Sequence, residues 1–434
     1  MPNLTSLVVN GCGGLRFLFS SSMARSLVQL KNLTISNCQI MEAIVSTNES
    51  SEEDTYHNMF SQLQDLSLQY LPNLTRFCSA RRSINFHSLE ILCLVDCSKL
   101  ETFIFDPMST NITINKATEE IRDSTVNIGT DARYFLFDEK GNPFPNLEVL
   151  DLDENTKIWY EAHGPLPAKL FINLKVIRFS CAHPYSFAFL QKLHNLEELV
   201  VYNGPWKEIF VYEGTSSGEI DSVGRTLPHI KNLCLHQMEE LMHLGNDNSE
   251  AIFPNLEILK VYRCPRLKNL TSSAISFQNL TTLDVWRCGG LKYLTTYSVA
   301  KCLQQLKNLE VEYCESMTEI VASNRDEQDS GNYYEIAFSS LQHLKLYDLP
   351  ILRGFCSSEI FTIRVPSLNS LDVYGCQIEL KISPDGSLIQ SGSRPERQEI
   401  TEEVEEEEDD ANETAFQFLL CYACVSNAMS ITAL

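Results

Sequence analysis

The sequence is poor in basic residues and lacks short motifs that carry much of enzyme chemistry. Lys and Arg number 34 against 57 Asp and Glu, which gives a formal net charge of −23. Such a polyanion is poorly suited to bind nucleic acid or an anionic membrane surface. The chain contains no Gly-x-x-x-x-Gly-Lys-Ser/Thr phosphate loop and no His-Glu-x-x-His zinc motif. We therefore expect a binding protein that is not an enzyme and holds no cofactor or metal.

A secretory leader and a convincing membrane span are also missing. Residues 1–4 already read as part of a repeat, so no basic stretch followed by an apolar one opens the chain. The uncharged segment 415–434 is interrupted by polar side chains and preceded by acidic ones, unlike a membrane anchor. We expect a cytoplasmic protein without a membrane partner, and the role of this apolar C-terminal segment stays open.

The abundant feature of the chain is one phrase, Leu-x-x-Leu-x-Leu-x-x-Cys, which occurs in thirteen copies. The strict copies begin at Leu4, Leu30, Leu89, Leu256, Leu280, Leu306 and Leu368. The looser copies begin at Leu63, Leu147, Leu174, Leu196, Ile230 and Leu341. This phrase is typical of leucine-rich repeats, in which each repeat supplies one short parallel strand.

The spacing inside the phrase predicts the orientation of its side chains. With the first Leu as position 0, the apolar side chains at +3 and +5 are two positions apart, so both point to one face of a strand. The side chains at +2, +4 and +6 then face solvent. We predict an α/β fold, a curved leucine-rich-repeat solenoid with parallel strands on the concave face and short helices, 3-10 turns and loops on the convex face.

The intervals between repeats predict the domain organisation. Most first leucines follow one another at short and similar intervals, whereas the interval from Leu89 to Leu147 is by far the longest. We predict one solenoid over residues 1–380 with an insertion loop near 106–142. Nine acidic residues within 402–413 predict a disordered acidic tail over 381–414.

Seven of the fifteen cysteines occupy the same +8 position. A free thiol there packs as a small apolar group that donates weakly to the backbone, so repeat packing explains the spacing without disulfide bonds. Because no paired-cysteine cap flanks the array, a reducing compartment is favoured.

The first four repeats resemble the last four in order. Cys12-Gly13-Gly14-Leu15 matches Cys288-Gly289-Gly290-Leu291, and Phe77-Cys78-Ser79 matches Phe355-Cys356-Ser357. The offset between the matching segments is nearly constant throughout. This stretch of the chain therefore reads as one block used twice.

Together these residues resemble a known family. The run from Cys12 to Phe19, the segment Ser22 to Val45 and the entry phrase Phe-Pro-Asn-Leu at Phe144 and Phe253 are similar to the leucine-rich-repeat region of plant coiled-coil nucleotide-binding disease-resistance proteins. The resemblance covers roughly residues 1–380. It implies a protein ligand, either a pathogen effector or a modified host protein, and an autoinhibitory contact that holds a nucleotide-binding domain inactive. The phosphate loop of that domain is absent from this sequence.

The side chains predicted to face solvent indicate where a partner binds. Aromatic side chains crowd position +6 from the seventh repeat onward, and charged ones fill +4. Exposed Tyr and Trp with charges between them concentrate binding energy in interfaces, although β-propensity also enriches aromatics in strands. The candidate binding residues are Tyr202, Tyr262, Trp286, Tyr347, Tyr374, Lys260, Asp284, Glu310, Glu312, Lys345 and Asp372.

Two other classes of protein use similar repeats. A substrate receptor of a ubiquitin ligase should carry an adaptor-binding helical motif before the repeats, where we expect no room. An extracellular recognition protein should carry a leader and cysteine-paired caps. We expect none of these three features in this protein, so the intracellular recognition module is the preferred interpretation.

Overall fold

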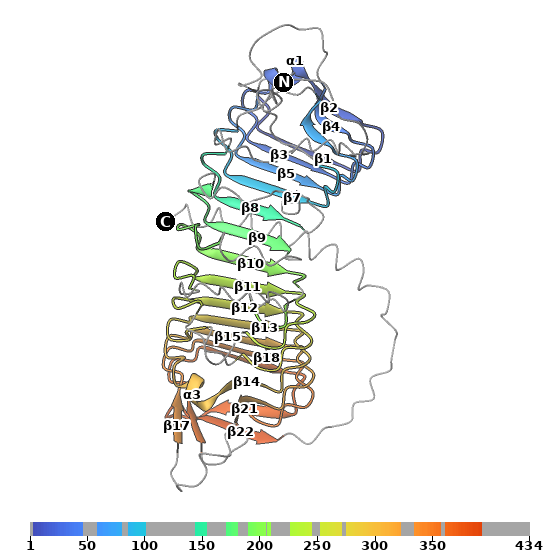
Figure 1. The fold of residues 1–434 in the computed structure, drawn as a ribbon. Helices are drawn as coiled ribbons and strands as arrows, with labels where there is room; N and C mark the ends of the chain where they lie inside the picture. The colour runs from blue at the N-terminus through green and yellow to red at the C-terminus, as the bar shows by residue number, and fades with distance from the viewer. Residues whose placement is uncertain are drawn as a thin grey trace, which may run out of the picture. The chain divides into compact units, whose positions relative to one another are not determined.

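The fold is a stack of parallel coils, seen here in a computed structural model. The structure describes residues 3–46, 59–79, 86–100, 144–153, 171–180, 190–204, 206–209, 226–244, 252–270, 275–322, 334–356 and 361–392. Thirteen strands form one sheet in chain order (Figure 1). They are β1 Ser6–Asn10, β3 Asn32–Ser36, β5 Asp65–Gln69, β7 Ile91–Val95, β8 Val149–Leu152, β9 Val176–Ser180, β10 Glu198–Tyr202, β11 Asn232–His236, β12 Ile258–Tyr262, β13 Thr282–Trp286, β15 Asn308–Glu312, β18 His343–Tyr347 and β20 Ser370–Tyr374.

Each strand begins at position +2 of a repeat and pairs in parallel with the next strand at the same repeat position. Leu283 of β13, for example, is opposite Leu259 of β12 and Leu309 of β15. One strand per phrase and a constant register are what the repeat spacing predicts. The predicted leucine-rich-repeat solenoid is therefore confirmed.

The core follows the predicted inward positions. Leu256, Leu259 and Val261, at positions 0, +3 and +5 of one repeat, are fully buried. Behind them runs a second layer of phenylalanines, in which Phe60 contacts Phe77 and Phe77 contacts Phe86 with ring centroids 5.8 and 5.2 Å apart. Stacking neighbours thus bury a continuous core that no single coil could close alone.

Position +7 turns the chain out of each strand. Ten described residues other than glycine have a positive φ, and nine of these are at position +7. Gly11 and Gly375, which also have a positive φ, occupy the same position. The N–H at +7 donates to the +6 carbonyl of the next coil, as Arg263 does to Trp286 at 2.8 Å. The following thiol at +8 turns inward, and Cys288 lies 3.5 Å from the carbonyls of both Val261 and Trp286. These are the weak backbone contacts expected of a cysteine there.

Short strands line the other side of some coils. They are β2 Phe17–Ser20, β4 Ala43–Ser46 and β6 Arg76–Cys78 in one sheet, β14 Tyr293–Thr296 with β16 Glu319–Ala322, and β17 Tyr334–Ala337 with β19 Phe361–Arg364. The two α-helices whose bounds are described are short, α1 Ser21–Ser26 with six residues and α3 Tyr297–Ala300 with four. Each begins directly after a strand, at the corresponding place of the two matching blocks. The structure repeats the block that the sequence repeats.

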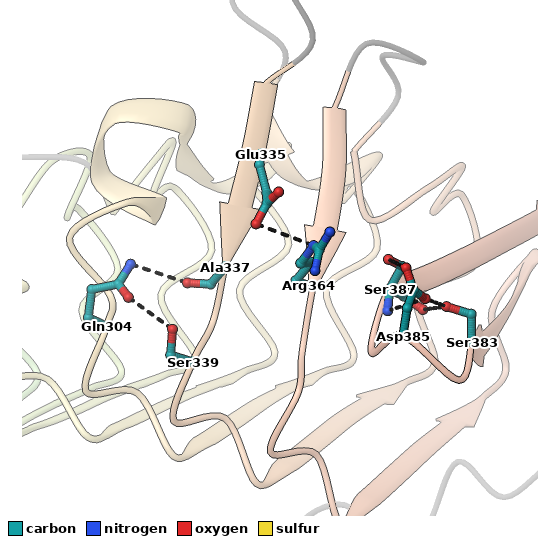
Figure 2. Close-up of polar contacts among 8 residues, drawn as sticks. All are labelled: Gln304, Glu335, Ala337, Ser339, Arg364, Ser383, Asp385 and Ser387. Carbon is teal, nitrogen blue, oxygen red and sulfur yellow. Dashed lines mark hydrogen bonds and ion pairs between the residues drawn. The ribbon is translucent and has the colours of Figure 1, made fainter.

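Side-chain ladders tie the rims of the coils together. In the Phe-Pro-Asn-Leu phrase the amide of Asn146 donates to the carbonyl of His87 at 2.6 Å, and that of Asn255 donates to the carbonyl of Pro228 at 2.9 Å. The amide is thus an inter-coil strut. Figure 2 shows further struts near the last coils, where Gln304 donates to the carbonyl of Ala337 at 3.2 Å.

An antiparallel hairpin, β21 Ile378–Ile382 and β22 Leu388–Gly392, follows the last repeat strand. Asp385 in its turn accepts hydrogen bonds from the hydroxyls of Ser383 and Ser387 (Figure 2). The repeat phrase does not predict this hairpin, and the expected boundary at residue 380 falls inside β21. The expected insertion loop at 106–142 and the apolar segment 415–434 lie outside the described residues, as does the acidic run of the expected 381–414 tail.

Candidate protein-binding surface

Two neighbouring rows of side chains cover the solvent face of the last five strands of the large sheet. The constant register places the +4 side chains of successive coils opposite one another, and the +6 side chains likewise. The +4 row is Lys260, Asp284, Glu310, Lys345 and Asp372, and the +6 row is Tyr262, Trp286, Glu312, Tyr347 and Tyr374. All the predicted binding residues except Tyr202 thus form one continuous surface.

Aromatic rings form a chain of contacts along the +6 row, which we call the aromatic ladder. It consists of His236, Tyr262, Trp286, Tyr313, Tyr347 and Tyr374. Successive ring centroids lie 6.3, 6.4, 6.4, 5.3 and 5.1 Å apart. The first three contacts are edge-to-face, and the last pair is stacked at 26°. Edge-to-face and offset geometries are the favourable ones for aromatic pairs, so the rings hold each other in place.

Two arginines pack on Trp286. The guanidinium carbon of Arg263 lies 5.1 Å from the indole centroid and that of Arg287 lies 4.7 Å from it. Arg287 also lies 5.7 Å from the ring of Tyr313. A cation over an aromatic face is attracted by the ring quadrupole. Trp286 is therefore a half-buried ring fixed on several sides before any partner arrives.

Hydrogen bonds fix the polar members of the surface. The hydroxyl of Tyr262 donates to the carboxylate of Asp284. Burial raises the pKa of Asp284, while the hydrogen bond from Tyr262 opposes that rise. In the next coils Lys345 donates to Glu312 at 2.7 Å, and this bond raises the pKa of Lys345. Both carboxylates are thus oriented by a neighbouring coil.

The remaining predicted residue, Tyr202, precedes these five strands and lies in register with His236 of β11. It stands at the end of β10, and its hydroxyl donates to the carbonyl of Leu152 at 2.7 Å. The ladder begins one coil later, with His236. Burial and the nearby charge of Arg263 lower the pKa of His236 to about 4, so this imidazole is neutral at pH 7. The hydroxyl of Tyr202 thus links β10 to β8, an earlier strand of the sheet.

Sequence reasoning left out His236, although it stands in the +6 column, and it missed three further members of the surface, Tyr313, Arg263 and Arg287. All three are at +7, the left-handed position that directly follows each strand. Strand alternation predicts a face only for residues within the strand. The +7 residues follow the strand, so the pattern of +2, +4 and +6 positions did not include these three side chains. The +7 column of the sequence is the signal that could have found them.

The same face is chemically different in the first coils. At +6 Asn10 is exposed, whereas Ser36 and Gln69 are buried with 2% and 7% of their surface accessible. Ser36 donates to the side chain of Asn10 at 3.1 Å. The expectation that every +6 side chain faces solvent is wrong for Ser36 and Gln69, because polar groups here bond to one another instead of extending outward. It is wrong as well for the +6 side chains of β11 and of the two coils at β8 and β9, which are also buried: Asp153, Ser180 and His236.

One carboxyl of the early coils gives a pH-dependent prediction. Burial raises the pKa of Asp65, at +2 on β5, from 3.8 to about 6. The folded state holds this proton more tightly than the unfolded state, so the group destabilises the fold when ionised and stability increases as pH falls from about 6 to about 4. Asp65→Asn should raise the free energy of unfolding at pH 7.5 by about 1 to 2 kcal/mol, allowing for partial exposure. Urea melts of the parent and of Asp65→Asn at pH 7.5 and just below pH 4 check this, since the gain in unfolding free energy must vanish at the lower pH. An equal gain at both pH values would contradict it.

The described residues contain no group of three or more side chains placed to hold a metal ion. None of their helices has the length and apolar character needed to cross a bilayer. One Gly-x-Ser-x-Gly phrase occurs at residues 214–218, outside the described ranges.

Comparison with known proteins identifies the repeats. The family model of plant disease resistance protein RPS2-like leucine-rich repeats matches residues 1–116, 145–276 and 270–382. The unmatched stretch between the first two segments overlaps the expected insertion. A search of the curated proteins found no match.

Proposed function

Because the chain belongs to the family of RPS2-like leucine-rich repeats of plant disease resistance proteins, we propose that it is a protein-recognition module of plant defence. Its ligand would be a pathogen effector or a host protein that an effector has modified. A nucleotide-binding domain of the resistance type is the second partner we propose. The role would be binding without catalysis.

The observation that carries this proposal is the aromatic ladder beside the charged +4 row. Large rigid rings lose little conformational entropy on binding when their neighbours already hold them. Tyr374 is 67% exposed and stacks on Tyr347, so one end of the ladder is open to a partner. Aromatic anchors surrounded by oriented charges are the residue types in which interfaces concentrate their energy.

The cysteines support an intracellular location for this role. All twelve cysteines that the structure describes are free thiols. Burial raises the pKa of Cys97 to about 12, which makes this thiol unreactive at neutral pH. We propose the cytoplasm, where such thiols stay reduced.

Affinity capture from leaf extract tests the proposal. The full chain serves as bait beside a variant with Tyr347→Ala and Tyr374→Ala, which removes the open end of the ladder. A ligand of this surface should be enriched on the parent bait and reduced at least tenfold on the variant, as loss of more than about 1.4 kcal/mol would require. Asn10→Ala, at +6 in the first coil, is the matched control bait. Equal recovery on all three baits would overturn the assignment of this surface.

A further inference from the structure

The charged +4 row beside the aromatic ladder alternates in sign except at its centre. In order along the sheet the row is Lys260, Asp284, Glu310, Lys345 and Asp372. The register places each of these residues opposite the next one on the adjacent strand. Every neighbouring pair joins opposite charges apart from the central one, Asp284 and Glu310. Their strands, β13 and β15, each have a described strand on either side, so this pair is internal to the sheet.

The two carboxylates of the central pair stand close together. Neighbouring strands lie about 4.8 Å apart, and like charges directly opposite on adjacent strands repel. Burial raises the pKa of Asp284, and the charges of Glu310 and Glu312 add to this rise. The hydrogen bond from Tyr262 and the charge of Lys260 oppose the rise without cancelling it. A further cation placed between Asp284 and Glu310 would therefore be attracted by both.

The nearby cations of the chain are engaged with other groups. Lys345 is opposite Glu310 in register, but its Nζ bonds to Glu312 at 2.7 Å. The guanidinium of Arg287 lies over the indole of Trp286 and makes no described hydrogen bond to a carboxylate. The carboxylate of Glu310 itself has no hydrogen bond or ion pair within the described residues. Because it is half-buried, part of it stays open to a partner.

Aromatic rings border the central pair. Tyr262 donates to Asp284, and Trp286 is in register with Glu312 on the next strand. A guanidinium can stack on a ring by its flat face while its edge donates to carboxylates. Two guanidinium groups of this chain already lie over the indole, 5.1 and 4.7 Å from its centroid. The surface thus accepts this group in the geometry that an incoming arginine would use.

We propose that the protein ligand of this surface presents an arginine side chain to the carboxylates of Asp284 and Glu310. This inference rests on the function proposed above, since it names the chemistry of that same ligand. The planar guanidinium donates in several directions at once, so one arginine can bridge both carboxylates. A lysine ammonium has the same charge on one compact group and matches two carboxylates less well. The arginine would complete the charge pattern of the row at the one place where the chain itself does not.

Unfolding of the free protein is the first part of the test. Glu310→Gln should leave the midpoint of a urea melt no lower than that of the parent, because no described bond to this carboxylate is lost. Glu257→Gln is the matched control, since it removes the same charge from an exposed +1 position two coils earlier. A midpoint for Glu310→Gln clearly below those of the parent and Glu257→Gln would show that the carboxylate is held within the fold, and would overturn the proposal.

Selection of peptides is the second part of the test. The full chain is immobilised and panned with a phage-displayed library of random dodecapeptides, and selected peptides are synthesised. They should contain arginine, and Glu310→Gln should weaken their binding about tenfold or more, as loss of one partner of a close charge pair does. Glu257→Gln should change it less than about twofold. Replacing the peptide's arginine by alanine should cost as much on the parent but little on Glu310→Gln, because the two changes remove one contact.

Several outcomes would refute the arginine contact. Selected peptides that bind without arginine, or that bind equally well with lysine in its place, would overturn it, and so would a library from which nothing is enriched. Peptides that bind Glu310→Gln like the parent but fail on the variant with Tyr347→Ala and Tyr374→Ala would overturn the arginine contact alone and leave the aromatic ladder as a binding surface. Equal binding to all variants would overturn both proposals.

Discussion

Replacing Leu283 by Ala should lower the free energy of unfolding by about 2 to 5 kcal/mol. Leu283 is 1% exposed and packs between Leu259 and Leu309 in the adjacent coils. The change removes the transfer free energy of the buried methyl groups and leaves a cavity that flanking coils cannot close, because backbone hydrogen bonds fix their spacing. Urea melts followed by circular dichroism measure the loss.

The duplication supplies a matched control for this variant. Leu7 is the counterpart of Leu283 in the first block, in the same phrase, but it is only partly buried because the described residues place no coil before it. Leu7→Ala should therefore cost less than half as much. Equal losses for the two variants would mean that burial by the preceding coil is not what stabilises this position.

Replacing Trp286 by Ala should weaken ligand binding about thirtyfold, as expected when a central anchor worth about 2 kcal/mol is truncated. The indole is central to the aromatic ladder, with Tyr262 and Tyr313 on its edges and two arginines on its faces. It points away from the core, so the fold should survive with a loss of about 1 kcal/mol from the cation–π contacts. Titration calorimetry with the ligand recovered by affinity capture measures the effect.

Asn10→Ala is the control for Trp286→Ala, because the two side chains occupy the same position in the duplicated blocks. It should change the affinity by less than twofold. If it weakens binding as much as Trp286→Ala does, the ligand does not distinguish the C-terminal coils. If Trp286→Ala unfolds the protein, the ladder is structural and the proposed surface is wrong.

Much of the architecture could be predicted because one phrase encodes it repeatedly. Leu at 0 and the apolar side chains at +3 and +5 are buried in coil after coil, and the side chains between them point to the other face. Alternation within a strand has a period of two, so position alone assigns each side chain to a face. The predicted rows of +4 and +6 side chains followed from this rule and from the constant register.

The remaining features depend on contacts that no local pattern encodes. Glu312, the +6 residue of its coil, has no ring, and Tyr313 takes its place between Trp286 and Tyr347. Tyr313 can do so because its backbone adopts the left-handed conformation after β15. Ser36 is buried because Asn10 of the previous coil bonds to it. The hairpin after β20 is held by Gln390, whose partners Phe355 and Cys356 are distant from it in the chain.

The constant register has a consequence for how such a chain changes over generations. Each coil meets its neighbour through the same few backbone bonds, whether the connection is short, as from β9 to β10, or long, as from β7 to β8. Insertion or deletion of a whole coil therefore leaves the pattern of backbone bonds between neighbouring coils unchanged, and only the side-chain contacts at the new boundary have to adapt. The doubled block is such an insertion made visible.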